Sequence, residues 1–359
     1  MAKSYADVWS QLVSFENLHL AWKNASKGKR AGLEVAQFEY ALESNLLDLQ
    51  SALKTGHYKP GAYRSFLIFD PKRRLVSAAP FADRVVHHTL MQVLEPIFER
   101  TFIGDSYANR VGKGTHAALE RAQRWVRAYR YVLQCDIKQF FPSVDHAVLY
   151  RLLAKKVACP RTLQLAKLIL DSGDGVLAAE YDMVYFAGDD LLATQRPRGL
   201  PIGNLTSQCW ANVYMNEVDQ LVKRQLHCTP YLRYVDDFLL FSNSKTELWA
   251  HKEAIVRKLN ELRLTLHDAS STVYPTKNGV GFLGLRLFGT FTRLKNRNVR
   301  AFDARLRGWQ LLVQAGEMSL DDVSLRVQGW VAHAEHADTR GLREQLLGKP
   351  WSLRPERKA

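Results

Sequence analysis

The stretch from Tyr231 to Ser242 constrains the fold of this chain more than any other. Two neighbouring acidic residues, Asp236 and Asp237, stand between two short apolar runs rich in aromatic residues, which are typical of β-strands. A tight hairpin usually turns on Asn-Gly or Asp-Gly, and two adjacent carboxylates repel each other unless a cation lies there. The stretch therefore predicts a hairpin whose tip is either a solvated turn or part of a cation site.

A third acidic residue lies near the end of another expected strand. Residues 131–137 form an apolar run, and Asp136 falls near its end. A buried carboxylate without a partner is costly, so Asp136 needs a lysine, a hydrogen-bonding cap or a metal ion. If this strand neighbours the hairpin, three carboxylates converge at one edge of a sheet. Mg²⁺ is often held by a few carboxylates together with substrate phosphates, so the pattern predicts a site for two divalent cations.

The charge of the chain indicates a polyanionic partner. Its 359 residues carry a formal net charge of +14, and the pI is about 9.6. A balance this basic most often belongs to a protein that binds nucleic acid, although a ribosome-associated or membrane-surface protein would fit it too. The length suits two or three subdomains that share a core.

The cysteines and the N-terminus favour a reducing compartment. The four cysteines form no Cys-x-x-Cys pair and no Cys/His cluster with zinc-ligand spacing. The first residues lack the apolar core of a signal peptide, and no apolar run is long enough to span a bilayer. We therefore expect a cytoplasmic protein that has no membrane among its partners.

Helical periodicity accounts for much of the first hundred residues. Residues 1–55 have apolar positions at helical spacing, and a second helix is expected from Phe81 to Phe98. We expect His87 and His88, within that helix, to be surface or cap residues, because no acidic or Cys partner lies at ligand spacing.

A basic hairpin is expected between these two helical parts. Residues 65–69 and 75–77 are strand-like, and Lys72, Arg73 and Arg74 stand at the turn between them. Strand ends that project Lys and Arg can grip phosphate oxygens. Protection of an edge strand by charge is the alternative. Three consecutive basic residues favour phosphate contact.

The C-terminal part carries a second basic run. Six basic residues between positions 293 and 307 stand against one acid, Asp303, and the pattern is helical from Arg300 onward. A solvated helix face would look similar, but an excess of this size favours a track for nucleic acid.

Several motifs of this chain occur together, and in the same order, in one family. They are Lys72-Arg73-Arg74 with Phe81-Ala82-Asp83-Arg84, Asp136 with Phe141 five residues later, Tyr234-Val235-Asp236-Asp237, and Phe282-Leu283-Gly284. These match the fingers pattern, the palm motif, the signature hairpin and the grip strand of reverse transcriptases. The chain therefore resembles a reverse transcriptase over nearly its whole length.

The resemblance implies an α+β fold of the right-hand polymerase type. Such a fold has fingers, a palm built on an antiparallel sheet with helices behind it in a split βαβ arrangement, and a short helical thumb. We expect an N-terminal helical extension in residues 1–55, fingers and palm in residues 56–288, and the thumb in residues 289–359. The implied reaction is the addition of deoxynucleotides to a 3′-hydroxyl, directed by a template RNA within an RNA–DNA duplex.

The resemblance also assigns residues to this reaction. The catalytic acids are Asp136, Asp236 and Asp237, and the metal site for two Mg²⁺ ions, which Mn²⁺ can replace, consists of these three and Ile137. The nucleotide-binding candidates are Lys72, Arg73, Arg74, Phe141, Ile202 and Gly203. The candidates for binding the template–primer duplex are Arg293, Lys295, Arg297 and Arg300.

Phe141 stands where the family places an aromatic steric gate. A ring there would collide with a 2′-hydroxyl and so select deoxynucleotides. An ordinary core phenylalanine beside Phe140 remains the alternative.

One loop departs from most of the family. Retroviral and intron-encoded enzymes usually have Gln-Gly-x-x-x-Ser-Pro, whereas residues 202–208 read Ile-Gly-Asn-Leu-Thr-Ser-Gln. This form resembles the reverse transcriptases of bacterial and phage diversity-generating retroelements, which copy a template RNA with errors at adenines and work with a small basic helical accessory protein. Ile202 can neither donate nor accept a hydrogen bond, so we hypothesise that discrimination between right and wrong base pairs is weakened.

A second departure concerns the general acid for the leaving pyrophosphate. Relatives tend to have a lysine near positions 271 and 272, where this chain has Ser271 and Thr272, with Lys277 nearby. The general acid therefore stays unassigned.

Three alternatives remain open at this point. A defence-associated bacterial reverse transcriptase would use the same chemistry on a dedicated non-coding RNA. An RNA-dependent RNA polymerase is disfavoured by Phe141. A non-catalytic RNA-binding scaffold is disfavoured because all three acids are present.

Overall fold

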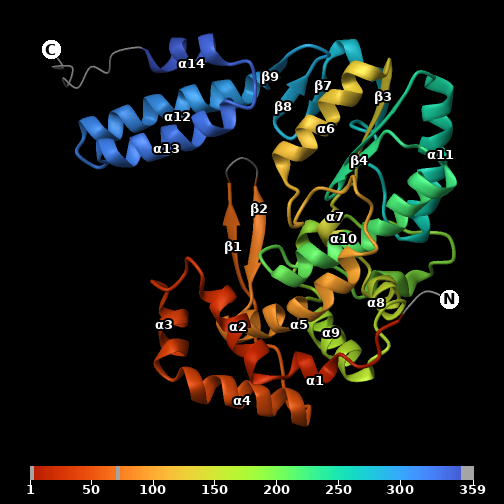
Figure 1. Ribbon diagram of the computed structural model, residues 1–359, viewed down its shortest axis with the longest axis vertical. Coiled ribbons are helices and arrows are strands. Elements are labelled where there is room, and N and C mark those ends of the chain that lie inside the picture. Colours follow the sequence, from red (N-terminus) through yellow and green to blue (C-terminus); the bar gives the residue numbers. More distant parts are fainter. Residues whose placement is uncertain (1–3, 70–72, 349–359) are drawn as a thin grey trace.

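Helices and three antiparallel sheets build the molecule, as the computed structural model describes for residues 4–69 and 73–348. In Figure 1 the N-terminal helices lie at the bottom, a two-stranded hairpin rises from them, and a four-stranded sheet lies to its right. The C-terminal helices extend across the top, above the hairpin. None of the helices in the described ranges is both long and apolar enough to cross a bilayer.

The N-terminal helices are held together by an apolar interior. They are α1 (Trp9–Leu12), α2 (Phe15–Ser26), α3 (Leu33–Tyr40) and α4 (Leu42–Thr55). The side-chain oxygen of Ser14 caps α2 by accepting a hydrogen bond from the backbone N–H of Asn17 at 3.1 Å. Leu12, Leu18 and Leu46 are fully buried. The helices predicted in residues 1–55 are therefore present.

The fingers hairpin consists of β1 (Arg64–Ile68) and β2 (Arg74–Ala78), in a register that pairs Phe66 with Val76. The next element is α5 (Phe81–Glu99). The hairpin and the helix expected here are both confirmed. Asp70, Pro71 and Lys72, which separate the two strands in the sequence, lie outside the described residues.

The surface position expected for His87 is wrong. Its side chain is 1% exposed, because α5 packs against α2 on one side and against α10 (Leu205–Gln220) on another. Burial lowers the pKa of His87 to about 3. A helix covered on several faces buries polar positions that a one-sided amphipathic pattern would leave in water.

The palm sheet has the strand order β4-β5-β3-β6, and all neighbours are antiparallel. Its strands are β3 (Tyr131–Asp136), β4 (Tyr231–Tyr234), β5 (Asp237–Ser242) and β6 (Thr272–Pro275). Strand β5 lies between β3 and β4, which therefore run parallel to each other. This is the split βαβ arrangement expected for the palm.

Helices and short helical turns fill the connections around the palm sheet. They are α6 (Thr115–Ala128), α7 (Phe140–Ser143), α8 (His146–Ala154), α9 (Pro160–Ser172), η1 (Ala178–Glu180), η2 (Leu191–Gln195), the π-helical turn η3 (Leu221–Gln225) that continues α10, and α11 (Lys245–Glu261).

Each strand of the palm sheet contributes to two hydrophobic cores, because successive side chains of a strand point to opposite faces. In β3, Leu133 and Cys135 join the core that includes α5 and the helices α8 to α11. Val132 joins the second core, with α6. Gln134 and Asp136 therefore share the face of Val132.

The grip sheet and the thumb helices complete the described structure. The grip sheet contains β7 (Val280–Phe282), β8 (Leu285–Leu287) and β9 (Thr292–Leu294). The thumb helices are α12 (Asn296–Gln314), α13 (Leu320–Ala334) and α14 (Arg340–Leu347). The rings of Phe302 and Trp330 stack with their centroids 3.8 Å apart and so join α12 to α13. Strand β9 pairs with β8, so the grip sheet continues past residue 289.

Candidate active site

The hairpin that carries Asp236 and Asp237 has a two-residue turn. Tyr234 pairs with Asp237 across β4 and β5, which leaves Val235 and Asp236 between them. Val235 has φ of 59°, a left-handed conformation for which such turns prefer glycine and which is strained for a β-branched residue. Strain of this kind costs about 1–3 kcal/mol and persists only where neighbouring contacts impose it.

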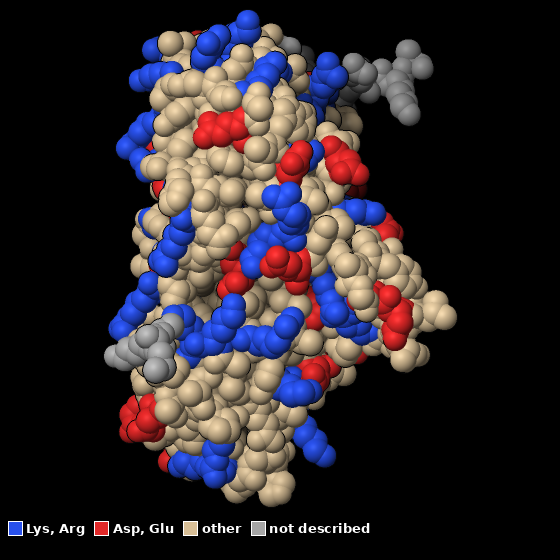
Figure 2. All heavy atoms as spheres, turned by 90° about the vertical axis from the view of Figure 1, so that its right-hand side faces the viewer, with Lys and Arg blue, Asp and Glu red and all other residues tan. Residues whose placement is uncertain are grey.

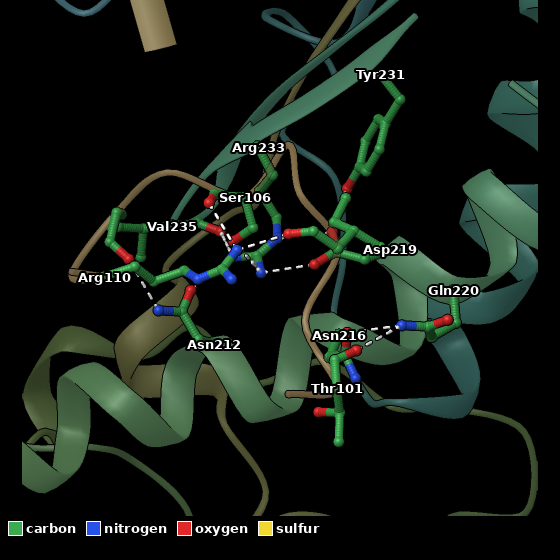
Figure 3. Close-up of polar contacts among 12 residues, drawn as sticks. Thr101, Ser106, Arg110, Asn212, Asn216, Asp219, Gln220, Tyr231, Arg233 and Val235 are labelled. Atoms are coloured by element: carbon green, nitrogen blue, oxygen red, sulfur yellow. Dashed lines mark hydrogen bonds and ion pairs between the residues drawn. The ribbon is translucent and has the colours of Figure 1, made fainter. Parts of the chain in front are cut away.

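A buried arginine supplies such a contact. The guanidinium of Arg233 is fully buried, and its Nη1 donates to the carbonyl oxygen of Val235 at 2.9 Å. Figure 3 shows this side chain beneath the turn, pointing toward α10. The hydrogen bond holds the strained residue from below and thereby orients the turn that carries the acidic pair.

Every N–H of the Arg233 side chain has a partner, which is the full capacity of an arginine. Nε and Nη2 donate to the two carboxylate oxygens of Asp219, at 2.8 and 2.7 Å. The other N–H groups donate to Asn212 Oδ1 at 3.0 Å and to Ser106 Oγ at 3.0 Å. The hydroxyl of Tyr231 also donates to Asp219, at 2.6 Å. This set of residues, the Arg233 network, buries a charge pair that is completely satisfied.

The acidic residues face the opposite way. Asp136 lies directly across from Asp237 in the register of β3 and β5, a placement that is unfavourable for like charges. Burial, followed by the charges of Asp136 and Asp236, raises the pKa of Asp237 to about 7. Burial and the charge of Asp136 raise the pKa of Asp236 to about 6. The three carboxyl groups are therefore close enough to oppose one another's ionisation.

This arrangement fits a divalent cation that the substrate helps to bind. In residues 4–69 and 73–348, no three His, Cys, Asp or Glu side chains are grouped so as to hold a metal ion unaided. Oδ1 of Asp237 is nevertheless buried without a hydrogen-bond partner. Mg²⁺ is commonly bound by one or two carboxylates together with substrate phosphates, so Asp136 and Asp237 suit such a site. The side chain of Ile137 is buried, which leaves its backbone carbonyl as the group that could take part.

The catalytic cavity is a hollow of about 880 Å³ between the palm, the fingers hairpin and the thumb. Asp136 and Asp237 line it from the palm and Arg74 lines it from the fingers hairpin. Lys295 lies in the same cavity, and its charge acts to lower the pKa of Asp237 against the effect of burial. The thumb residues that line the cavity are Arg297, Asn298, Ala301, Arg305, Trp330 and His333.

Residues that were not predicted support the acidic strand. Gln134 lines the cavity, donates to the carbonyl of Gly281 at 2.9 Å, and accepts from the hydroxyl of Tyr274 at 2.8 Å. The backbone N–H of Asp136 donates to Ser271 Oγ at 3.3 Å. Gln134 was detectable in principle, since a polar residue within an apolar strand requires partners.

A lysine does lie beside Ser271, although it comes from α11. Nζ of Lys252 donates to the backbone carbonyl of Ser271 at 2.6 Å. Lys277 lines a different cavity from the acidic pair.

The nucleotide-binding candidates are spread over several places. Arg74 lines the catalytic cavity, whereas Arg73 forms an ion pair with Glu180 at 3.0 Å. Lys72 lies outside the described residues. Phe141 is half-buried and packs edge-on against Phe140, with ring centroids 5.3 Å apart.

The loop that carries Ile202 and Gly203 is fastened to β2. The backbone N–H of Ser77 donates to the carbonyl oxygen of Ile202 at 2.8 Å. The buried side chain of Asn204 donates to the carbonyl of Ser77 at 3.3 Å and accepts from the N–H of Ala79 at 3.4 Å. Gly203 has φ of 120°.

The template–primer candidates divide into two groups. Lys295 and Arg297 line the catalytic cavity with Asp237. Arg293 lies over the ring of Phe291 and lines another cavity. Arg300 is exposed on α12 and lines none of the cavities described here.

Comparison with known proteins identifies the family. A family model described as reverse transcriptase (RNA-dependent DNA polymerase) matches residues 59–287, more than half of the chain. The chain belongs to this family. The reverse transcriptase is thus an RNA-directed DNA polymerase with a right-hand fold, and the fold class expected from the sequence is confirmed. Its family takes an RNA template and nucleotide substrates and generally uses divalent metal ions. The RNA-polymerase and scaffold alternatives are thereby set aside.

Individual relatives are distant. This reverse transcriptase is 23% identical to protein YkfC of Escherichia coli (strain K12) over 316 residues, which is 77% of this chain and 80% of YkfC. It is 27% identical to the group II intron-encoded protein LtrA of Lactococcus lactis over 183 residues, covering 50% of this chain but only 28% of LtrA. A solved apo telomerase of Candida tropicalis aligns over 70% of this chain and 60% of its own, with 13% identity and a TM-score of 0.46.

Proposed function

We propose that this reverse transcriptase copies a template RNA into cDNA with reduced accuracy, as the enzymes of diversity-generating retroelements do. The observation that carries the proposal is Ile202 at the position where most of the family has glutamine. Its carbonyl oxygen is engaged with Ser77, and its half-buried side chain has no polar atom. The residue therefore contributes bulk to the loop but no directional contact with a nucleotide or primer.

The acidic residues have the central role in the proposed reaction. Asp136 and Asp236 hold two Mg²⁺ ions, with Asp237 and the carbonyl of Ile137 assisting. When bound, such ions activate the primer 3′-hydroxyl and stabilise the leaving pyrophosphate. The raised pKa values of Asp236 and Asp237 support this role, because a bound cation would relieve the repulsion that raises them.

Basic and aromatic residues position the substrates in this proposal. Lys72, Arg73 and Arg74 hold the triphosphate, Gly203 lets the loop approach β2, and Phe141 excludes the 2′-hydroxyl. Lys295 and Arg297, with Arg293 and Arg300, hold the template–primer duplex. The proposed division is an N-terminal extension in residues 1–55, fingers and palm in residues 56–288, and a thumb in residues 289–359.

We also propose a small basic helical accessory protein as a partner. The net charge of +14 opposes direct attraction between two basic proteins. We therefore expect the template RNA to bridge them.

The test of reduced accuracy is the variant Ile202→Gln, with Ile202→Leu as a control that keeps the apolar character. Primer extension on a defined RNA, followed by sequencing of the cDNA, measures misincorporation opposite template adenine. One new hydrogen bond should lower misincorporation in Ile202→Gln by about fivefold to tenfold, while Ile202→Leu stays at the parent level. Equal error rates in all three proteins would refute the proposal. Accurate parent cDNA of one co-purifying non-coding RNA would instead indicate a defence role.

A further inference from the structure

Two more cavities lie along the grip sheet, one lined by residues of its strands and the other by residues of the connection between β8 and β9. The nearer one, of about 600 Å³, shares Lys295 with the catalytic cavity. The farther one, of about 610 Å³, shares Phe288 with the nearer one. The three hollows are therefore neighbours, and their lining extends from the acidic residues past β6 and the grip sheet to the start of β3. We call the second and third cavities together the back groove.

The back groove is lined by positive charge. No Asp or Glu lines either cavity in the described structure. Six exposed basic side chains line it, and none of them forms an ion pair with a carboxylate in the described ranges: Arg127, Arg130, Lys245, Lys277, Arg286 and Arg293. Figure 2 shows several Lys and Arg side chains at the upper end of the molecule, the end at which Figure 1 places β7, β8 and α6, and others farther down the same face. Unpaired cations in series are suited to a polyanion.

Aromatic rings are interleaved with these charges. Phe288 and Phe291 stack with their centroids 4.5 Å apart, and the guanidinium of Arg293 lies 4.9 Å from the ring centroid of Phe291. At the far end, Nζ of Lys245 lies 5.2 Å from the ring centroid of Tyr131. Half-buried rings beside cations are the combination by which proteins hold the bases and phosphates of single-stranded nucleic acid.

We propose that the back groove binds a single-stranded stretch of the template RNA next to the duplex in the catalytic cavity. Three observations support this occupant. The groove adjoins the catalytic cavity at Lys295, its lining is basic without acids, and half-buried rings lie among its cations, a combination that suits single-stranded nucleic acid. The template is the RNA that such an enzyme must hold. This site does not depend on how accurately the enzyme copies.

The test separates the groove from the catalytic cavity. One probe is a blunt RNA–DNA duplex without a tail, two others carry a 15-nucleotide single-stranded RNA tail at one or the other end of the template strand, and a fourth carries a tail of the same length at the 5′ end of the DNA primer strand. Fluorescence anisotropy gives the dissociation constant of each probe for the full chain. A tail at one end should tighten binding by about tenfold, through phosphate contacts and base stacking.

The variant Arg130→Glu/Lys277→Glu reverses two charges of the groove, neither of which has a carboxylate partner in the described structure. In this variant the tail should tighten binding by less than about threefold. Each lost phosphate contact should reduce the steepness of log K against log salt concentration by about 0.7. The dissociation constant of the tail-free probe should be unchanged. Arg224→Glu/Arg257→Glu, at two exposed positions outside the groove, changes the net charge equally and should keep the full gain.

Two outcomes would overturn the proposal. One is an equal gain from the tail in the groove variant and in the parent. The other is a loss confined to a probe whose tail is attached to the DNA primer strand, since that result would assign the groove to the product. Phe291→Leu gives a second measurement: it removes a ring but keeps an apolar side chain, and it should weaken tailed probes by about fivefold while leaving tail-free probes unaffected.

Discussion

The two faces of the β4–β5 hairpin carry buried charges in opposite states. On one face, Arg233 and Asp219 are both fully buried and form an ion pair at 2.7 Å, and every N–H of the guanidinium has a partner. On the other face, Asp136 lies opposite Asp237, and its charge opposes the ionisation of Asp237. The first face is electrostatically complete, whereas on the second face Oδ1 of Asp237 is buried without a hydrogen-bond partner.

This difference shows how one hairpin can be both rigid and reactive. The Arg233 network fixes the turn from the core side, and so the repulsion on the cavity side cannot be relieved by moving the strand. In the function proposed above, the carboxylates are thereby held close together for a cation, which is the preorganisation that electrostatic catalysis requires. Removing a residue of the Arg233 network should therefore affect stability, whereas removing an acidic residue of the opposite face should affect activity.

The largest expected effect is on activity and follows the change Asp236→Asn. Metal ions contribute several kcal/mol to such reactions, and each 1.36 kcal/mol is a factor of ten in rate. Mg²⁺-dependent primer extension should therefore fall by about 10³-fold or more, while the free energy of unfolding stays the same or rises. Asp48→Asn, at an exposed residue of α4, is the control and should keep full activity. If Asp236→Asn kept activity within tenfold of the parent, the acidic face would not be the catalytic one.

Removing one member of the Arg233 network should mainly lower stability. Asp219→Asn leaves a buried, unpaired guanidinium, which should cost about 3–5 kcal/mol in the free energy of unfolding measured with urea. The double variant Arg233→Met/Asp219→Leu removes both charges and should recover much of that loss. Arg224→Met, at an exposed arginine, should change stability by less than about 0.5 kcal/mol. A cost below about 1 kcal/mol for Asp219→Asn would show that the network is not a structural support.

The acidic face should make the free energy of unfolding of the metal-free protein depend on pH. Because the pKa of Asp237 is raised to about 7, the native state keeps a proton that the unfolded chain releases near pH 4. The free energy of unfolding contributed by this group is therefore lost as the pH rises from 4 through 7. His87, whose pKa burial lowers to about 3, acts in the opposite direction, so a variant has to isolate the effect.

Asp237→Asn serves as that variant. Its stability relative to the parent should increase by about 2–3 kcal/mol between pH 5 and pH 8 in the presence of EDTA. An excess of Mg²⁺ should reduce this difference by stabilising the parent alone. A difference that does not depend on pH would mean that the carboxylates do not repel each other.

The smallest effect is expected at the residue that joins the two faces. Val235→Gly removes the strain of φ at 59° but also raises the conformational entropy of the unfolded chain. Because these two effects oppose each other, the free energy of unfolding should change by no more than about 1 kcal/mol. The same change at Val132, which is fully buried in β3, should cost about 3 kcal/mol or more. Similar losses at both positions would show that Val235 is not strained.

The acidic residues and their strands could be predicted from the sequence because local patterns determine them. The apolar run around Asp136 and the apolar runs beside Asp236 are visible in any window of a few residues. The Arg233 network could not be predicted in the same way, since Asp219 belongs to α10 and meets Arg233 only in the folded chain. An arginine in the middle of an apolar strand was the one available signal that a buried partner must exist.

Burial on more than one side explains the incorrect prediction. His87 follows two valines in α5, and the helix periodicity alone cannot show that α2 and α10 cover two of its sides. The positions of the basic residues were equally hard to predict. Arg73 and Arg74 are adjacent in sequence, yet Arg73 pairs with Glu180 while Arg74 reaches the catalytic cavity.

The loop of residues 202–204 is attached to β2 by the backbone of Ile202 and by the side chain of Asn204, so the side chain at position 202 takes no part in that hydrogen bonding. Position 203 has no such freedom, because a Cβ there would lie 3.1 Å from Val76. In the function proposed above, the side chain at position 202 sets the rate of copying errors. That side chain can be replaced without removing the hydrogen bonds that attach its loop to β2. The accuracy of cDNA synthesis could therefore change by substitution at position 202 while the enzyme still folds.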